Sequence, residues 1–135
     1  MQVVTALLCD YASVREGLLN VLGGGVNRLW RAELPAPLNL SLALMVDLHP
    51  QEVGPPHELA ITVQDDDGGR ILELQGNFQA GQNPDAAIGE HALVPFGIDL
   101  RPAQAEGYGA FSVEIVIDGE HRHSIQFWVL PPNTN

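Results

Sequence analysis

An apolar residue, leucine in all cases but one, recurs at every second position in the stretch from Leu38 to His49, and this pattern constrains the fold more than any other feature of the sequence. Successive side chains of a β-strand point to opposite faces, so alternate residues share a face. One face of this stretch would hold Leu38, Leu40, Leu42, Leu44, Val46 and Leu48. A helix would spread these leucines around its whole surface. The stretch therefore predicts a long strand with one buried face.

The same two-residue period recurs along most of the chain. Further strands are predicted at 3–11, 18–22, 26–33, 58–64, 72–78, 93–100, 111–117 and 125–129. Pro95 favours an edge position for its strand, because proline donates no hydrogen bond to a neighbouring strand. The stretch 80–90 contains Gly81, Pro84 and Gly89, and we expect it to be the longest irregular loop.

Two hairpins can be placed in register by keeping their apolar faces in phase. A four-residue loop, Asp66–Gly69, pairs Val63 with Leu72. In the last hairpin, a two-residue Asp118-Gly119 turn would put the two apolar faces out of phase. A three-residue loop, Asp118–Glu120, pairs Val113 with Ile125, and we therefore favour the longer loop despite the strong Asp-Gly turn signal.

Short strands separated by turns, with no crossover helix, predict an all-β fold. We expect an antiparallel β-sandwich of about eight to nine strands, either immunoglobulin-like or jelly-roll-like. A length of 135 residues fits one domain, and no linker or repeat divides the chain. Residues 1–135 are therefore expected to form a single sandwich domain.

The charge balance excludes some classes of partner. The chain has 17 acidic residues and 6 arginines but no lysine, which gives a net charge of −11. Nucleic acids and anionic membranes would repel such a chain, so we expect neither as a partner. No apolar run approaches the roughly 20 residues of a membrane-spanning helix. A single cysteine, an N-terminus without a basic segment and the absence of lysine favour a bacterial, cytoplasmic protein.

The segment from Val3 to Cys9 is apolar on both faces, unlike a sandwich strand with one face in water. We expect the loop 80–90 or another subunit to cover it, and the second option predicts a homo-oligomer. Trp128 falls on the face opposite Phe127 and Val129, and an outward tryptophan often marks a contact surface. The candidate interface residues are Val4, Ala6, Leu8 and Trp128.

His121 and His123 are the best candidates for a metal site. Residues two apart share a face of a strand, so both imidazoles could reach one ion on the inward face. The spacing does not identify a third ligand among His91, Glu90, His57 and His49. The alternative interpretation is two polar residues at the rim of the sandwich.

The run from Asp65 to Asp67 could serve a calcium ion, as loops at the ends of sandwiches do. Calcium requires six to eight oxygen ligands, usually from several loops. An acidic run before two glycines is also an ordinary hairpin tip. Cys9 and the serines have no recognisable nucleophile context, and Gly23-Gly24-Gly25 lacks the Lys-Ser/Thr of a phosphate-binding loop.

The opening LLCDYASVREGLLNVLGGG and the close GYGAFSVEIVIDGEHRHSIQFWV resemble a family of small, uncharacterised bacterial proteins. Members open with a strand ending in Cys-Asp, here Cys9-Asp10, followed by a Gly-Leu-x-Asn-x-Leu-Gly-Gly stretch, here Gly17 to Gly24. The resemblance implies a β-sandwich and brings no activity with it. The close is also similar to the final strands of immunoglobulin-like sandwiches, where a tyrosine such as Tyr108 ties a corner through its hydroxyl.

The sequence thus leaves the function unknown and favours a non-enzymatic module without a cofactor. We expect it to bind another protein or copies of itself. The alternatives are a metal-binding protein or metal-dependent enzyme using His121 and His123, and a calcium-dependent module using Asp65–Asp67.

Overall fold

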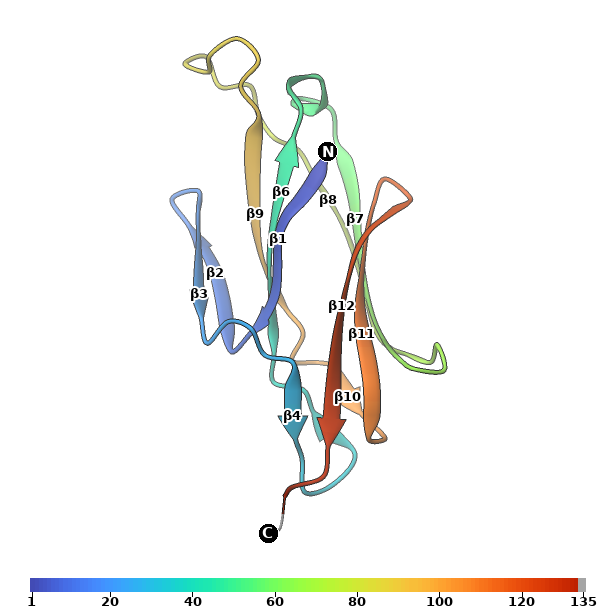
Figure 1. Ribbon diagram of the computed structural model, residues 1–135. Coiled ribbons are helices and arrows are strands. Elements are labelled where there is room, and N and C mark those ends of the chain that lie inside the picture. The colour runs from blue at the N-terminus through green and yellow to red at the C-terminus, as the bar shows by residue number, and fades with distance from the viewer. Residues whose placement is uncertain (134–135) are drawn as a thin grey trace.

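The computed structural model describes residues 1–133 and contains twelve strands and one short 3₁₀ helix (Figure 1). In chain order these are β1 (Gln2–Cys9), β2 (Tyr11–Arg15), β3 (Leu18–Leu22), β4 (Arg28–Trp30), β5 (Ala36–Pro37), β6 (Ser41–Leu48), η1 (Pro50–Glu52), β7 (His57–Asp65), β8 (Arg70–Phe78), β9 (Ala92–Asp99), β10 (Gln104–Ala105), β11 (Gly109–Ile117) and β12 (Glu120–Leu130). No helix among the described residues has the length and apolar character needed to cross a membrane.

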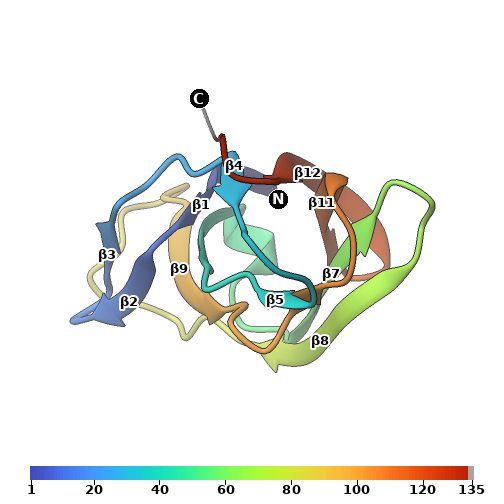
Figure 2. The same cartoon turned by 90° about the horizontal axis from the view of Figure 1, so that it is seen from below.

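Two sheets face each other in a sandwich-like arrangement, seen end-on in Figure 2. One sheet has the order β1-β6-β9 and the other has the order β4-β12-β11-β7-β8. All their pairings are antiparallel except the short pairing of β4 with β12. The predicted all-β, antiparallel class is confirmed. Three strands, β2, β5 and β10, were not indicated by the sequence pattern, and two of them, β5 and β10, have only two residues each.

The alternating leucines of β6 lie in the core, as predicted. The six apolar residues of 38–48 that share a face are at most 1% exposed. They meet the inward residues of the larger sheet, which come from β7, β11 and β12: Ile61, Val63, Phe111, Val113, Ile115, Ile117, Phe127 and Val129. Burial of this continuous apolar surface is the main force that holds the two sheets together.

The hairpin β7–β8 has the predicted register, with Val63 opposite Leu72 and a loop of four residues. In the hairpin β11–β12, Val113 lies opposite Ile125 as predicted, but the three-residue loop is wrong. The turn has two residues, Asp118 and Gly119, both with positive φ, as a type I′ turn requires. A bulge farther along the hairpin restores the phase of the two apolar faces.

β9 lies at an edge of its sheet, as Pro95 predicted. The irregular stretch between β8 and β9 covers residues 79–91, close to the predicted loop. At the opposite end of the sandwich, β5 pairs with β10 and lies across the opening between the sheets (Figure 2). Ala36, Ala103 and Ala105 are buried there, so this small pairing closes one end of the core.

The end of the apolar segment of β1, at Leu7 and Cys9, is covered by the chain's own β2–β3 hairpin, and not by the loop 80–90 that one prediction named, while Val4 is 47% exposed. The chain turns at Asp10, whose N–H donates to the Leu22 carbonyl, and β2 then pairs with β3. Ala12 and Leu19 of the hairpin pack on Cys9 and Ala43, on the outer face of the smaller sheet. The hairpin is therefore a small third layer beside β9 (Figures 1 and 2).

Candidate functional site

The outer face of the five-stranded sheet carries most of the candidate functional residues. This face is turned away from the core, and β4 and β8 form its two edges. Residues that alternate with the buried ones stand on it, among them Trp128 of β12, Glu114 of β11 and Glu58 of β7. It holds three features: an aromatic patch near β4, a polar network in the middle and a groove near β8.

The aromatic patch consists of Arg28, Trp30, Trp128 and Leu130. β4 runs parallel to β12, with Arg28 beside Trp128 and Trp30 beside Leu130. Trp30 is 53% exposed, while Trp128 and Leu130 are half-buried. A shallow hollow of about 290 Å³ lies between Arg28, Trp128 and Leu130. The chain's two tryptophans therefore share one outward-facing surface.

Arg28 and Arg31 lie at this end of the sheet but differ in their contacts. Arg31 donates hydrogen bonds to the carbonyl oxygens of Pro37 and Leu38, at 3.1 and 2.8 Å, and so fastens the chain after β4. The Tyr108 hydroxyl donates to the Arg31 carbonyl at 2.8 Å, so this tyrosine does tie a corner, with a segment far away in the sequence. Within residues 1–133, the exposed Arg28 guanidinium makes no ion pair.

The polar network is centred on the half-buried carboxylate of Glu114. It accepts hydrogen bonds from Ser112 Oγ at 3.0 Å, from Ser124 Oγ and from His121 Nε2 at 2.7 Å. Burial acts to raise the pKa of Glu114, but the bonds from Ser124, His121 and Ser112 outweigh it and lower the pKa. Glu114 is therefore held as a carboxylate.

This serine–histidine–glutamate cluster does not have the geometry of a catalytic triad. In a triad the acid and the serine contact different nitrogens of the imidazole ring, so that a proton can be taken up on one side while the acid orients the other. Here Ser124 Oγ lies 2.9 Å from His121 Nε2, the same nitrogen that contacts Glu114. The cluster satisfies polar groups on the sheet surface and provides no activated nucleophile.

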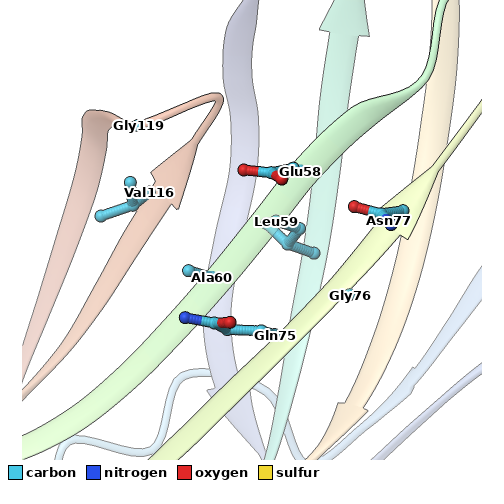
Figure 3. Close-up of a pocket in the computed structure, with 8 residues that line it drawn as sticks. All are labelled: Glu58, Leu59, Ala60, Gln75, Gly76, Asn77, Val116 and Gly119. Atoms are coloured by element: carbon cyan, nitrogen blue, oxygen red, sulfur yellow. The ribbon is translucent and has the colours of Figure 1, made fainter.

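The groove lies at the other edge of the sheet and has a volume of about 480 Å³ (Figure 3). Glu58 and Asn77 stand on adjacent strands at its side, and Gln75 and Val116 also line it. Gly76 and Gly119 add no side chains, which leaves the groove open. It offers carboxylate and amide groups for hydrogen bonding, and none of its eight described lining residues is a nucleophile or a histidine.

His121 and His123 do not share a face, in contrast to the prediction. The bulge in β12 falls at Arg122, so His123 lies opposite the buried Ile115 while His121 lies opposite Val116 on the outer face. His121 bonds to Glu114 and Ser124, as described above. Simple strand alternation fails here because the bulge adds one residue to β12.

The remaining histidines lie apart from this pair and have partners of their own. His91 Nδ1 lies 2.7 Å from Asp47 Oδ1, and the His49 Nδ1 atom accepts a hydrogen bond from the Gln51 N–H. The buried His57 is held between the Glu52 carbonyl and Asp118. Within the described chain, no three His, Cys, Asp or Glu side chains form a group that could hold a metal ion.

Asp65 serves the hairpin loop between β7 and β8. Its Oδ1 atom accepts hydrogen bonds from the N–H groups of Asp67 and Gly69, at 3.0 and 2.7 Å. Asp66 and Asp67 are exposed at the tip. This is the arrangement of an Asx-type turn, in which an aspartate side chain bonds to nearby backbone N–H groups.

Two of the predicted interface residues in β1 face the core. A bulge at Val4 shifts the register, so Ala6 and Leu8 lie opposite Leu44 and Leu42 between the sheets. Leu8 is 1% exposed and cannot meet a partner, which corrects the expectation for this side chain. Val4 is 47% exposed, and a contact role for Val4 and Trp128 stays a prediction.

Sequence reasoning did not place Trp30 beside Trp128. The parallel pairing that joins them involves three residues of β4 and segments about 100 positions apart, so no local pattern signals it. A signal existed in the alternation of Arg28 and Trp30 around the buried Leu29, which marks both side chains as outward-facing. The Glu114 network was also missed, because it depends on cross-strand neighbours.

The sequence profile of one protein family matches residues 4–130, and that family is described as a family of unknown function, DUF6941. No curated protein matches the chain. The match covers nearly the whole chain and confirms the resemblance to an uncharacterised family at that level. The chain therefore belongs to the DUF6941 family of unknown function.

Proposed function

We propose that this chain is a non-enzymatic protein-binding module that contacts its partner through the aromatic patch. The observation that carries this proposal is the presence of both tryptophans, with Leu130 and Arg28, on one outward-facing surface. Trp, Tyr and Arg are the residues that most often dominate the energetics of protein interfaces. Trp30 is 53% exposed and is therefore accessible to a partner.

The unpaired Arg28 indicates the chemistry of the partner. The chain has a large excess of acidic residues, yet this guanidinium, next to Trp128, makes no ion pair within the described residues. An arginine at an aromatic surface can bind a carboxylate in a two-pronged arrangement while its planar group stacks. The proposed partner surface is therefore apolar, with an aspartate or glutamate positioned for Arg28.

We also place the module in the bacterial cytoplasm. The single cysteine is buried as a thiol, and its Sγ lies 3.5 Å from the Ser41 carbonyl, which fits a reducing compartment. The absence of lysine fits a host with a GC-rich genome.

Site-specific photo-crosslinking in cells tests the proposed function. A benzoylphenylalanine at position 30 should give a discrete adduct with one protein, identified by mass spectrometry. The same probe at position 93, an exposed leucine on β9, is the matched control and should not give this adduct. Adding Trp128→Ala or Arg28→Ala should reduce the adduct at least tenfold, because truncating a residue that dominates an interface costs about 2 kcal/mol or more.

An adduct of twice the chain mass would identify a second copy as the protein bound and would equally support the proposal. Identical adducts from positions 30 and 93, or an adduct that Trp128→Ala leaves unchanged, would overturn it. Circular dichroism of the variants checks that they remain folded.

A further inference from the structure

β8 is the longest edge strand of the two main sheets. β4, at the opposite edge of the same sheet, has only three residues. β9 carries Pro95 and lies under the β2–β3 hairpin, and β1 has a bulge and bonds through its Leu8 carbonyl to the N–H groups of Gly25 and Val26. β8 has nine residues, no proline and no lysine, and Glu73 is the one charged side chain in its regular part, Leu72–Phe78. Natural proteins normally block such an edge against strand pairing.

The backbone direction of β8 follows from that of β7. The Asp118 N–H donates to the Glu58 carbonyl at 2.9 Å, so Glu58 directs its backbone groups toward β11. Alternate residues of a strand point to opposite sides, so Ile61 of β7 directs its groups toward Leu74, its partner in β8. The residues between, Glu73, Gln75 and Asn77, must then direct their N–H and C=O groups away from β7, toward open solvent.

The regular part of β8 is centred on Gln75. The bulge in the β7–β8 pairing falls at Ile71, so seven residues, Leu72 to Phe78, pair regularly with β7. Leu72, Leu74 and Phe78 face the core but are only half-buried, unlike the inward residues of β11. The apolar edge of the sandwich is thus incompletely covered along β8.

We propose that a second copy of this chain pairs with β8 along this edge, antiparallel and centred on Gln75. Gln75 then lies opposite Gln75 of the other copy, and Glu73 lies opposite Asn77. These pairs form about six backbone hydrogen bonds, two for each hydrogen-bonded pair. The two five-stranded sheets become one continuous sheet.

Side-chain complementarity selects this register. Glu73 meets the amide of Asn77, whereas a pairing centred on position 73 would place two carboxylates directly opposite each other. On the core side, Leu74 lies opposite Gly76, which has no side chain, and Leu72 lies opposite Phe78. Leu72 thereby gains an apolar neighbour, and Leu74 gains a space that its side chain can occupy.

Sedimentation velocity of the full chain from about 1 to 500 µM tests the pairing, because a small strand interface is expected to dissociate in this range. The wild-type chain should form a dimer. Gln75→Pro should raise the dissociation constant at least tenfold, since proline lacks the N–H that faces the partner and leaves the bonds to β7 intact. Gln75→Ala is the matched control and should dimerise like the wild type.

Crosslinking tests the register and remains informative if the proline variant folds poorly. Opposite residues in a hydrogen-bonded pair have Cα atoms about 5.5 Å apart, within disulfide range. Gln75→Cys should therefore form a disulfide-linked dimer on mild oxidation, and Glu73→Cys should not. The native Cys9 is buried and does not interfere.

A wild-type chain that stays monomeric at 500 µM would overturn the proposal, as would a dimer that Gln75→Pro does not weaken. Crosslinking through Glu73→Cys in place of Gln75→Cys would overturn the register. This edge is separate from the aromatic patch, so a negative result here leaves the proposed protein-binding function standing, and the converse also holds.

Discussion

His57 is the most completely buried ionisable side chain of the described chain that has an acidic partner. It is 7% exposed, and its ring lies 5.3 Å from that of Phe78. Nε2 lies 2.7 Å from the Glu52 carbonyl, and Nδ1 lies 2.7 Å from Asp118 Oδ2. A carbonyl can only accept a hydrogen bond, so both ring nitrogens are best used as donors, which requires the charged imidazolium.

The pKa of His57 is raised by the Glu52 carbonyl, against the effect of burial, and further by Asp118. The pKa of Asp118 is lowered by the Glu58 N–H and by His57. Stability from His57 is fully present below the unfolded-state pKa of about 6.5 and is lost as pH rises through its folded-state pKa. Stability from Asp118 is present above about 3.9 and is lost as pH falls through its lowered pKa. The pair therefore stabilises the fold most between these limits.

We predict that His57→Gln lowers the free energy of unfolding by about 2 kcal/mol at pH 5.5, because it removes a buried charge-assisted bond. The loss should shrink as the pH is raised toward 8.5, because the imidazolium is lost as pH rises through the raised pKa of His57. Denaturant unfolding at the two pH values measures both effects, with His123→Gln, an exposed histidine, as control. An equal loss at both pH values would show that His57 contributes through packing and not through charge.

A single inserted residue explains why the two histidines near the last turn were misplaced by sequence reasoning. Alternation alone puts His121 and His123 on one face, and it is correct for the rest of β12, where Phe127 and Val129 are buried. The bulge at Arg122 has no clear sequence signature. A two-residue Asp118-Gly119 turn alone would put the apolar faces of the two strands out of phase. The extra residue in the bulge brings these faces back into phase, so the strand keeps both the short turn and a buried apolar face.

At the level of elements, the β2–β3 hairpin depends on close contact with β9. A Cβ atom at Gly97 would stand 2.6 Å from the Ala12 carbonyl oxygen and 3.1 Å from the Ser13 Cα atom. Both neighbours are backbone atoms, so the hairpin would have to move as a unit. The absence of a side chain at Gly97 therefore lets β2 lie directly on β9.

We predict that Gly97→Ala lifts the hairpin and destabilises the fold by about 1–3 kcal/mol, the usual cost of overpacking. Cys9, which is fully buried beneath the hairpin, should then react with a thiol reagent at least tenfold faster under native conditions. Gly107→Ala is the control, because a Cβ there meets no atom within 4 Å. Labelling at the wild-type rate would mean that the hairpin accommodates the extra methyl group without opening.

The hairpin also shows the limit of reading elements from the sequence. The strand at 18–22 is predicted correctly, whereas the predicted cover over the segment 3–9 is present only at its end, over Leu7 and Cys9. The chain reversal at Asp10 was not foreseen, because its reason is tertiary: Cys9 and Ala43 need apolar neighbours, and Ala12 and Leu19 supply them. Burial of this kind also raises the pKa of the Cys9 thiol, which keeps the side chain neutral.

For the whole molecule, the net charge of −11 is the main long-range destabilising effect. Self-repulsion of like charges weakens a compact state and is screened by salt. We predict that raising NaCl from 20 to 200 mM increases the melting temperature by about 3 °C, an effect of somewhat less than 1 kcal/mol for a chain of this size. Differential scanning calorimetry at low protein concentration measures it. A melting temperature that falls with salt would show that local ion pairs outweigh the repulsion.

The overall architecture was accessible from the sequence because its alternation is nearly unbroken in β6, β7, β11 and the end of β12. Those strands form the core, and their faces are dictated by burial alone. Only half of the aromatic patch could be predicted from the sequence. Alternation places Trp128 on the outer face, whereas Trp30 reaches it through a short parallel pairing of distant segments. Such pairings obey the geometry of the completed sheet and not a local residue pattern.

The strand order β4-β12-β11-β7-β8 has a consequence for valency. It places the aromatic patch and the open edge at opposite margins of one sheet. Two copies joined at β8 would carry their patches at the two far ends of a single continuous sheet. A partner with two matching sites at that spacing would bind with avidity, because the second contact forms within an already tethered complex and gains a high effective concentration.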